Sequence, residues 1–474
     1  MSLTSALDSA KSSLLATQTQ TAIVSRNIAN LNDPNASRKY ANVVTGPGGR
    51  VEVTSIARSQ NSVLYRNMLD STSAVGSWSA ISSGYQRLDE TIGDTTLSRS
   101  PSAMISGLSD RLLALSGNPG SFEFARTALD AARDLAANLN DLSATVQAVR
   151  RDADNSLLHA AEDMNAILAD IERLNEKVVS GTVAGSDVTD FVDKRDAAVA
   201  RLSAYVGVNA RIRGDNDLVL HTDSGVNLFD KRARLVEFTP SSPLGSGQSG
   251  SALRIDGVQV TGEGAFMPLR SGSVVGLTQL RDEIAPTFEA QLDELARGLV
   301  EAFSETVGGE KRSGLFTVGA DGEPVREGAS HGFAASLRVD ARAAADPTLI
   351  RDGINIAPPA GAGSGYTDRI AALYEALGSS RAYSTEAGLA QTGSLANFAA
   401  SSLGWLQAGR ASALSEVEYR TTLNERTRET MSNETGINLA QEMTLLTDLQ
   451  RSYQASAKLI STVDEMLAAL LQTV

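Results

Sequence analysis

The sequence predicts a mainly α-helical protein with inserted β segments, in which the N- and C-terminal helices pair as a coiled coil. Three observations lead to this prediction. Apolar residues recur at steps of four and three residues at both ends of the chain, which is the spacing of coiled-coil seams. Residues 121–180 contain neither glycine nor proline. Short β-type runs, separated by Gly, Ser, Pro and Asp, gather between residues 208 and 365.

The first element is an amphipathic helix at the start of the chain. Its apolar stripe includes Leu3, Leu7, Leu14, Val24 and Ile28. The helix ends at "NIANLNDPN", because asparagine, aspartate and proline interrupt the helical pattern there. A stripe this long needs a partner along its whole length.

The last element has the same stepping and a wider apolar face. Gly436 precedes the helix and Asn438 is a suitable N-cap. A second apolar line lies beside the main stripe, so one partner helix does not cover it. We therefore expect the terminal helices to pair and to need neighbouring copies of the chain for full cover. The assembly residues predicted on this helix are Leu439, Met443, Leu446, Tyr453, Ile460, Leu467 and Leu471.

The middle of the chain reads as helices interrupted by two β-like stretches. The glycine-free stretch predicts one rod, with residues 152–156 as the most favourable place for a bend, and a further helix covers Leu277 to Phe303. We expect three domains. They are a terminal coiled coil (1–45 with 436–474), a helical rod (46–207 with 272–309 and 366–435) and a β-rich outer domain (208–271 with 310–365).

The composition argues against several kinds of chemistry. The net charge is −14, which disfavours nucleic acid or an anionic membrane as a partner. The chain has no cysteine and three histidines far apart in sequence. We find no phosphate-binding loop and no paired catalytic carboxylates, so we expect no enzyme activity, no cofactor and no metal. The N-terminal segment lacks a continuous apolar core, so a cleaved signal peptide is not expected.

Three stretches resemble a known family. "SRNIANLNDP", with Asn27, Ile28, Ala29 and Asn30, is similar to a signature of flagellar rod, hook and junction proteins. "EMTLLTDLQRSYQASAKLISTVDEML" is similar to the C-terminal end of those proteins. "DFVDKRDAAVARLSAYVGV", with Asp193, Arg195 and Asp196, resembles a segment of the flagellar hook-associated protein 1 family. The chain departs from the family after the first signature, where "DPNASRKYANVV" replaces the usual G-Y-[TS]-R.

The resemblance implies a structural protein of the hook–filament junction, exported through the flagellar type III apparatus and located outside the cell. It implies a ring of about eleven copies, with the hook protein, the second hook–filament junction protein and an export chaperone as partners. One alternative is another axial protein, either the second junction protein or a flagellin-like filament subunit. The other is an enzyme or a sugar-binding activity in the β segments, which a convergent pair of carboxylates in a pocket would favour.

Overall fold

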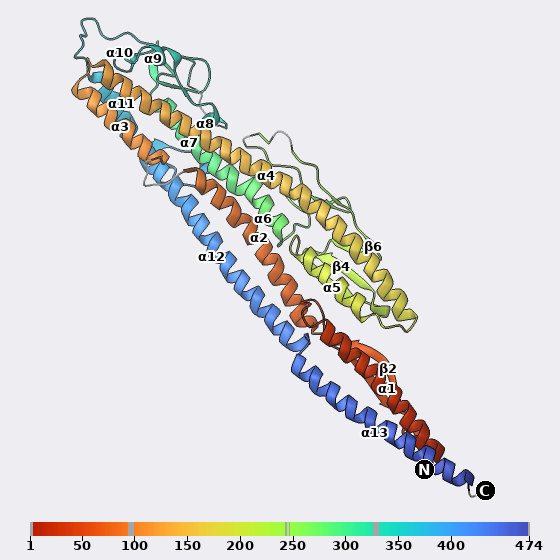
Figure 1. The fold of residues 1–474 in the computed structure, drawn as a ribbon. Coiled ribbons are helices and arrows are strands. Elements are labelled where there is room, and N and C mark those ends of the chain that lie inside the picture. Colours follow the sequence, from red (N-terminus) through yellow and green to blue (C-terminus); the bar gives the residue numbers. More distant parts are fainter. Residues whose placement is uncertain (1–2, 93–98, 242–243, 246, 326–330, 473–474) are drawn as a thin grey trace.

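The protein is elongated, and its long helices run along one axis (Figure 1). The computed structural model describes residues 3–92, 99–241, 244–245, 247–325 and 331–472. Its main helices are α1 Leu3–Ala29, α2 Ser62–Ile92, α3 Pro101–Gly117, α4 Phe122–Val183, α5 Thr189–Ser203, α6 Ser273–Gln279, α7 Ala285–Ala302, α11 Asp368–Gly378, α12 Leu395–Thr435 and α13 Leu439–Gln472. The prediction of a mainly α-helical fold with inserted β segments is confirmed.

Helix α4 runs along the middle region as one unbroken helix of 62 residues. The hydroxyl of Ser121 caps its start by accepting a hydrogen bond from the amide of Phe124. One face carries apolar residues at three- and four-residue spacing and is buried along the whole length. The helix continues through residues 152–156, where the sequence favours a bend, because Asp154 is held there by Arg281 instead of interrupting the helix.

The terminal unit, as we call α1, the hairpin β1–β2 and α13, forms the narrow end of the molecule (Figure 1). Strand β1 (Lys39–Thr45) pairs antiparallel with β2 (Val51–Arg58), and both pack on α1. The hairpin therefore extends the terminal unit to residue 58, beyond the boundary at residue 45 that the sequence predicts.

Helices α1 and α13 pair antiparallel, as two contacts along the pair show. Ser13 lies against Ser456, and Asn27 lies against Glu442. One series of buried positions repeats every seven residues on each helix: Ala10, Thr17 and Val24 on α1, and Glu442, Leu449, Ser456 and Val463 on α13.

This seam is rotated from the predicted one. The predicted seam on α13 consists of Leu446, Ile460 and Leu467 and of the residue four positions after each of them. In the structure, the residues three positions later are buried instead, among them Leu449 and Val463. Small and polar residues fill much of the seam, so an apolar pattern does not reveal it.

Two small sheets cover the C-terminal half of α4 together with α5. One has the strand order β3-β4-β5-β6 and the other β7-β8-β9. Their apolar residues share one core cluster with α4 and α5. The strands are β3 Val208–Ile212, β4 Leu218–Thr222, β5 Asn227–Asp230, β6 Arg232–Ala233, β7 Val236–Glu237, β8 Arg254–Ile255 and β9 Val258–Gln259.

Residues 305–393 form separate, smaller structures near the broad end. Their apolar residues pack in a different core cluster, with α3, α7, α11 and α12. They contain two-stranded ladders and three short helices: β10 Glu305–Val307, β11 Glu310–Arg312, β12 Phe316–Thr317, α8 Phe333–Ser336, β13 Arg338–Val339, α9 Ala341–Ala345, α10 Leu349–Asp352, β14 Arg381–Ala382 and β15 Thr392–Gly393.

The structure thus differs from the single β-rich outer domain that we expect from 208–271 and 310–365. Among the described residues, no sheet contains strands from both segments. The reason is packing: Leu220 and Phe229 are buried with α4 and α5, whereas Phe316 and Leu337 are buried with α7 and the N-terminal half of α4.

The helix predicted over Leu277 to Phe303 is also divided. Helix α6 begins earlier, and a π turn at Leu280–Ile284 joins it to α7. Pro286 follows the turn and has no N–H for a regular helical hydrogen bond.

Candidate assembly interface and its anchor

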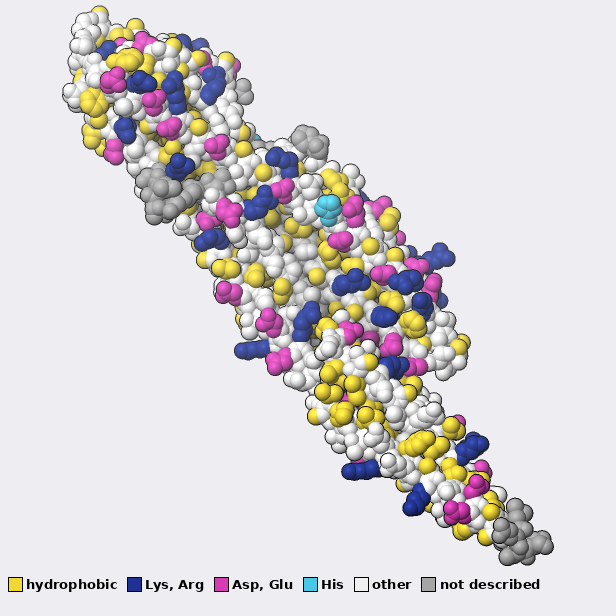
Figure 2. Space-filling view, viewed as in Figure 1, with side chains coloured by type: hydrophobic (Ala, Val, Ile, Leu, Met, Phe, Trp, Pro, Cys, Tyr) yellow, Lys and Arg dark blue, Asp and Glu magenta, His cyan; other side chains and the backbone are white. Residues whose placement is uncertain are grey.

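The terminal unit leaves a broad apolar surface exposed. Figure 2 shows apolar side chains, in yellow, along the narrow end of the molecule. On α13, the exposed fraction is 59% for Leu459 and 48% for both Met443 and Tyr453. Leu15 on α1 and Tyr40, Val43 and Val44 on β1 are also exposed. Exposed apolar patches of this kind mark interaction surfaces in soluble proteins.

The predicted assembly residues differ in burial. Val24 is buried within the α1–α13 seam. Leu439, Met443 and Tyr453 are exposed on α13. Leu471 belongs to α13, but its side chain lies outside the described residues. The half-buried residues are Leu3, Leu7, Leu14, Ile28, Leu446, Ile460 and Leu467.

A buried polar cluster, which we call the anchor network, attaches the terminal unit to the middle region. Asn27 stands at its centre, in the last turn of α1, and is 1% exposed. Its side-chain amide donates to the carbonyl of Lys39 (2.9 Å) and accepts from the N–H of Lys39 (3.1 Å). The same amide donates to Glu442 on α13 at 3.0 Å. Asn27 therefore ties together the end of the first helix, the hairpin and the last helix.

Glu442 is the carboxylate of the network on α13. It is completely buried, and it accepts from Nε of Arg38 at 2.7 Å. It lies in the first turn of α13, where the helix dipole favours a negative charge. Asn438 caps that turn, because its side-chain oxygen accepts from the amides of Ala440 and Gln441.

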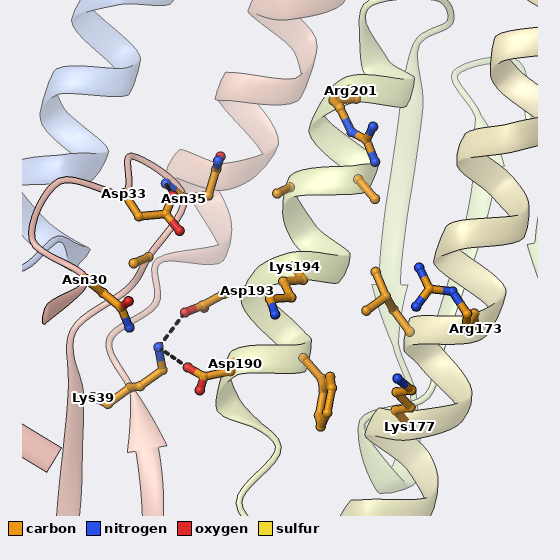
Figure 3. Close-up of a pocket in the computed structure, with 15 residues that line it drawn as sticks. Asn30, Asp33, Asn35, Lys39, Arg173, Lys177, Asp190, Asp193, Lys194 and Arg201 are labelled. Atoms are coloured by element: carbon orange, nitrogen blue, oxygen red, sulfur yellow. Dashed lines mark hydrogen bonds and ion pairs between the residues drawn. The ribbon is translucent and has the colours of Figure 1, made fainter. Parts of the chain in front are cut away.

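Asp193 connects the network to α5. Its two oxygens accept from Nζ of Lys39 (2.9 Å) and Nη1 of Arg58 (3.0 Å), and from the hydroxyl of Ser37 (2.7 Å). Asp190 also binds Nζ of Lys39 at 2.7 Å but is much more exposed. Figure 3 shows Lys39 reaching from the hairpin to both carboxylates.

The next two signature residues on α5 face in different directions. Asp196 binds Nη2 of Arg58 and so belongs to the anchor network. Arg195, which is 1% exposed, turns toward α4 and donates to Asn175 (2.8 Å) and to the carbonyl of Asn216 (2.7 Å). The signature on α5 therefore joins the terminal unit on one side to α4 and the β3–β4 turn on the other.

The electrostatics agree with a fully charged network. Burial by itself lowers the pKa of Arg58, but the carboxylates of Asp196 and Asp193 outweigh this effect and raise that pKa above its ordinary value. Burial lowers the pKa of Arg195, and the neighbouring positive charge of Arg58 lowers it further. Buried charges of this kind stay in place only when they are paired and hydrogen-bonded.

The remaining signature residues have simpler roles. Ile28 is half-buried on α1, and Ala29 is the exposed last residue of that helix. Asn30 begins the turn that follows, where its N–H donates to the carbonyl of Arg26.

Neither the signatures nor the apolar stripes of the sequence indicate that Lys39, Arg58 and Glu442 belong to this network. Lys39 lies in "DPNASRKYANVV", the segment that departs from the family pattern, so the departure itself was the signal.

The enzyme alternative needs a pair of carboxylates in a pocket of the β segments. A cavity of about 510 Å³ includes Ala210 and Leu218 together with Asp193 and Asp196, but both carboxylates bind Arg58. A cavity of about 170 Å³ beside residues 313–336 is lined by Glu323 and His331, with no second carboxylate among the described residues. Within the described ranges, no three His, Cys, Asp or Glu side chains are placed to bind a metal. In the same part of the chain, no helix is long and apolar enough to span a bilayer.

Comparisons with known proteins give matches at two places in the chain. Residues 85–311 match the helical domain of flagellar hook-associated protein FlgK, and residues 429–473 match the C-terminal region of the flagellar basal body rod FlgEFG proteins. These matches place the chain among the structural proteins of the bacterial flagellum. Within that class, the longer match supports a flagellar hook-associated protein of the FlgK type, as the resemblance predicts.

One solved structure is similar over part of its length. The flagellar hook junction protein FlgK from Burkholderia pseudomallei is 22% identical, with a TM-score of 0.42. The similarity covers 54% of this chain and 47% of that chain, so it spans about half of the solved protein. No curated protein matches this chain.

Proposed function

We propose that this protein forms the junction between the flagellar hook and the filament by self-assembly through its terminal unit. The observation that carries the proposal is the exposed apolar face of the paired helices α1 and α13. Leu439, Met443, Tyr453, Leu459 and Met466 are each between 45% and 59% exposed on α13 alone. A chain that worked as a monomer would gain nothing from leaving these side chains in water.

The magnitudes favour contact with several neighbours. Covering five half-exposed side chains contributes roughly 4–7 kcal/mol, at about 1.5–3 kcal/mol for each fully buried side chain. Association costs about 4–15 kcal/mol in lost freedom of motion. One contact on this face is therefore marginal, whereas contacts on several sides of the terminal unit are sufficient. A closed ring of about eleven copies would supply them.

The proposed partners follow from the same surface. In this proposal, the terminal unit, which contains the predicted domain 1–45 with 436–474 and extends to residue 58, packs against sister copies, the hook protein and the second hook–filament junction protein. Before assembly, the apolar face of α13 binds an export chaperone as a helix in a groove. The middle region and the small sheets face outward. Export proceeds through the flagellar type III apparatus, and the assembled protein lies outside the cell.

A deletion strain tests the proposal. Cells without the gene should build hooks of normal length but no filaments, and should release filament subunits into the medium. Electron microscopy of the hooks and immunoblots of the medium measure both results. A plasmid copy should restore filaments, whereas a copy with Met443→Ser, Tyr453→Ser and Leu459→Ser should not. Normal filaments in the deletion strain would refute the proposed function.

The matched control changes equally exposed apolar residues away from the terminal unit. Leu113→Ser, Phe122→Ser and Tyr374→Ser lie on α3, α4 and α11 at the opposite end, where the parent side chains are 41% to 55% exposed. This variant should restore filaments, which separates a loss of assembly from a general effect of lowering surface hydrophobicity.

A further inference from the structure

A groove between α4 and α5 carries an excess of positive charge in an otherwise acidic chain. We call it the basic groove and define it by Arg173 and Lys177 of α4 and Lys194 and Arg201 of α5, which line a cavity of about 590 Å³. Figure 3 shows these four side chains around the space between the two helices. All four residues are exposed.

The positive charge of the groove is only partly neutralised. Arg173 and Arg201 share one carboxylate, Asp170, at 2.8 and 3.6 Å. Lys177 lies over the ring of Phe191, 5.3 Å from its centre. In the part of the chain that the structure describes, Lys194 makes no ion pair.

The acidic side chains at the inner wall of the groove are already engaged. Asp190 and Asp193 both bind Lys39, so they do not compensate the four cations. Asp33, at the rim, accepts from the amide of Asn35. The groove therefore suits a ligand with several carboxylates.

A matching row of carboxylates lies on α12. Glu418, Glu425 and Glu429 are exposed and, within the described residues, form no ion pair. Their spacings of seven and four residues place them on one face, separated by roughly 10 and 6 Å along the helix axis. Lys194 and Arg201 are also seven residues apart on α5, and Arg173 and Lys177 are four apart on α4. The acidic row thus combines on one helix the two spacings that the cations show separately on α5 and α4, with opposite charge.

Within one molecule the acidic row does not reach the basic groove, because no described residue of α12 lines that cavity. Over most of their length α12 and α4 lie on opposite edges of the protein (Figure 1), and only the C-terminal part of α12 lines a separate cavity with α5. We propose that the acidic face of α12 from one copy docks in the basic groove of the next copy. Because the two surfaces differ, the contact is head-to-tail, and such contacts repeated around an axis close into rings.

The inference rests on the proposed self-assembly and names a side-to-side contact for it. The net charge of −14 disfavours a long polyanion such as nucleic acid as the occupant of the groove. With a second copy as the occupant, the electrostatic repulsion is offset at the contact itself, because carboxylates come to lie next to unneutralised cations. Exposed apolar side chains on α12, Leu414 and Tyr419, lie close to the glutamates in sequence and would be covered by the same contact.

Charge reversal in the full-length protein tests the contact. Lys194→Glu with Arg201→Glu should lower incorporation into flagella by at least about fivefold, since several ion pairs become repulsive. Glu418→Lys with Glu425→Lys should do the same. The chain with all four changes should return to near wild-type incorporation, because every subunit then supplies both reversed surfaces. Incorporation is measured by immunoblots of isolated hook–filament structures.

The control variant is Arg111→Glu with Lys311→Glu, which changes the charge equally at exposed positions outside the groove and should incorporate normally. Circular dichroism melting curves establish that all variants fold. Normal incorporation of either reversed pair, or no recovery in the fourfold variant, overturns the inference. Absence of the wild-type protein from flagella would overturn the proposed function instead, so the two failures are distinguishable.

Cross-linking gives an independent measurement. The natural chain has no cysteine, so Lys194→Cys with Glu425→Cys introduces the only two thiols. A short bis-maleimide should then link assembled copies into a ladder of oligomers on a denaturing gel. The pair Lys311→Cys with Glu425→Cys should give no ladder. Equal ladders from the two pairs, or none from either in assembled flagella, would contradict the proposed contact.

Discussion

Two carboxylates on α5 bind the same ammonium group but differ in burial, and this difference leads to a sharp prediction. Asp193 and Asp190 approach Nζ of Lys39 at 2.9 and 2.7 Å. The Asp193 side chain is 8% exposed and that of Asp190 is 46% exposed. The shorter distance would make Asp190 the more stabilising partner of Lys39, whereas burial would make it Asp193.

The expected cost of Asp193→Asn is about 3–5 kcal/mol. This substitution leaves Lys39 and Arg58 buried with too little negative charge. A cost of about 3–5 kcal/mol is typical when one partner of a buried ion pair is removed. It also replaces an oxygen that accepts from Arg58 or Lys39 by an amide that donates. Asp190→Asn should cost less than about 1 kcal/mol, because solvent screens the exposed pair.

The assay is urea unfolding followed by circular dichroism, with hydrogen exchange to locate the change. Asp193→Asn should lower the free energy of unfolding and speed exchange in α1, β1 and the first turns of α13. Lys39→Met combined with Asp193→Leu should recover part of the loss, since no buried charge is left on Lys39 or Asp193. Equal losses for the two single variants would show that burial is not what sets the strength of the anchor network.

Three further predictions follow from the described contacts. Asn27→Ala should destabilise the protein by about 1–3 kcal/mol, because the backbone N–H and carbonyl of Lys39 lose their hydrogen bonds to Asn27, and Glu442 loses one of its two partners and keeps Arg38. Asn30→Ala should have little effect in the same unfolding assay. Burial raises the pKa of Asp293 to about 7, although its carboxylate accepts from the amides of Ala334 and Gly332. Between pH 4 and pH 7 the folded state then holds a proton that the unfolded state has lost, so the free energy of unfolding should fall by at most about 1.4 kcal/mol for each unit by which the pH rises. Over this range the urea midpoint of Asp293→Asn should fall less than that of the unchanged protein. Gly276→Ala should lower the melting temperature, because the added Cβ would lie 2.2 Å from the carbonyl oxygen of Ser77. Gly107→Ala should instead raise stability by about 0.5–1 kcal/mol, because this helical position has no other atom within 4 Å of the added Cβ. A loss of stability in both variants would contradict the packing argument.

Local patterns predict the helices well, because the spacing of apolar residues and the caps lie within each segment. Helix α4, the two terminal helices and their pairing all follow from periodicity in the sequence. The exact seam does not, because Ala10, Thr17 and Ser456 occupy positions that a search for large apolar residues passes over. The same limit explains the β segments, whose grouping depends on which distant helices bury them.

The anchor network shows why the site is only partly predictable. Asn27 and Asp193 belong to signatures that the sequence displays, but their partners lie far away along the chain. Asn27 and Glu442 are 415 residues apart, and Lys39 and Asp193 are 154 residues apart. Pairing over such separations leaves no periodic trace, and an isolated charged residue is usually a solvated one.

The small side chains in the α1–α13 seam have a mechanical consequence. The alanine, threonine and serine positions of the seam offer little to stop the two rods sliding past each other by a heptad. The buried Asn27–Glu442 contact at one end prevents this, since a slip would strand a carboxylate against a neighbour that cannot bind it. A push along the axis of one rod is therefore passed to the other without slippage.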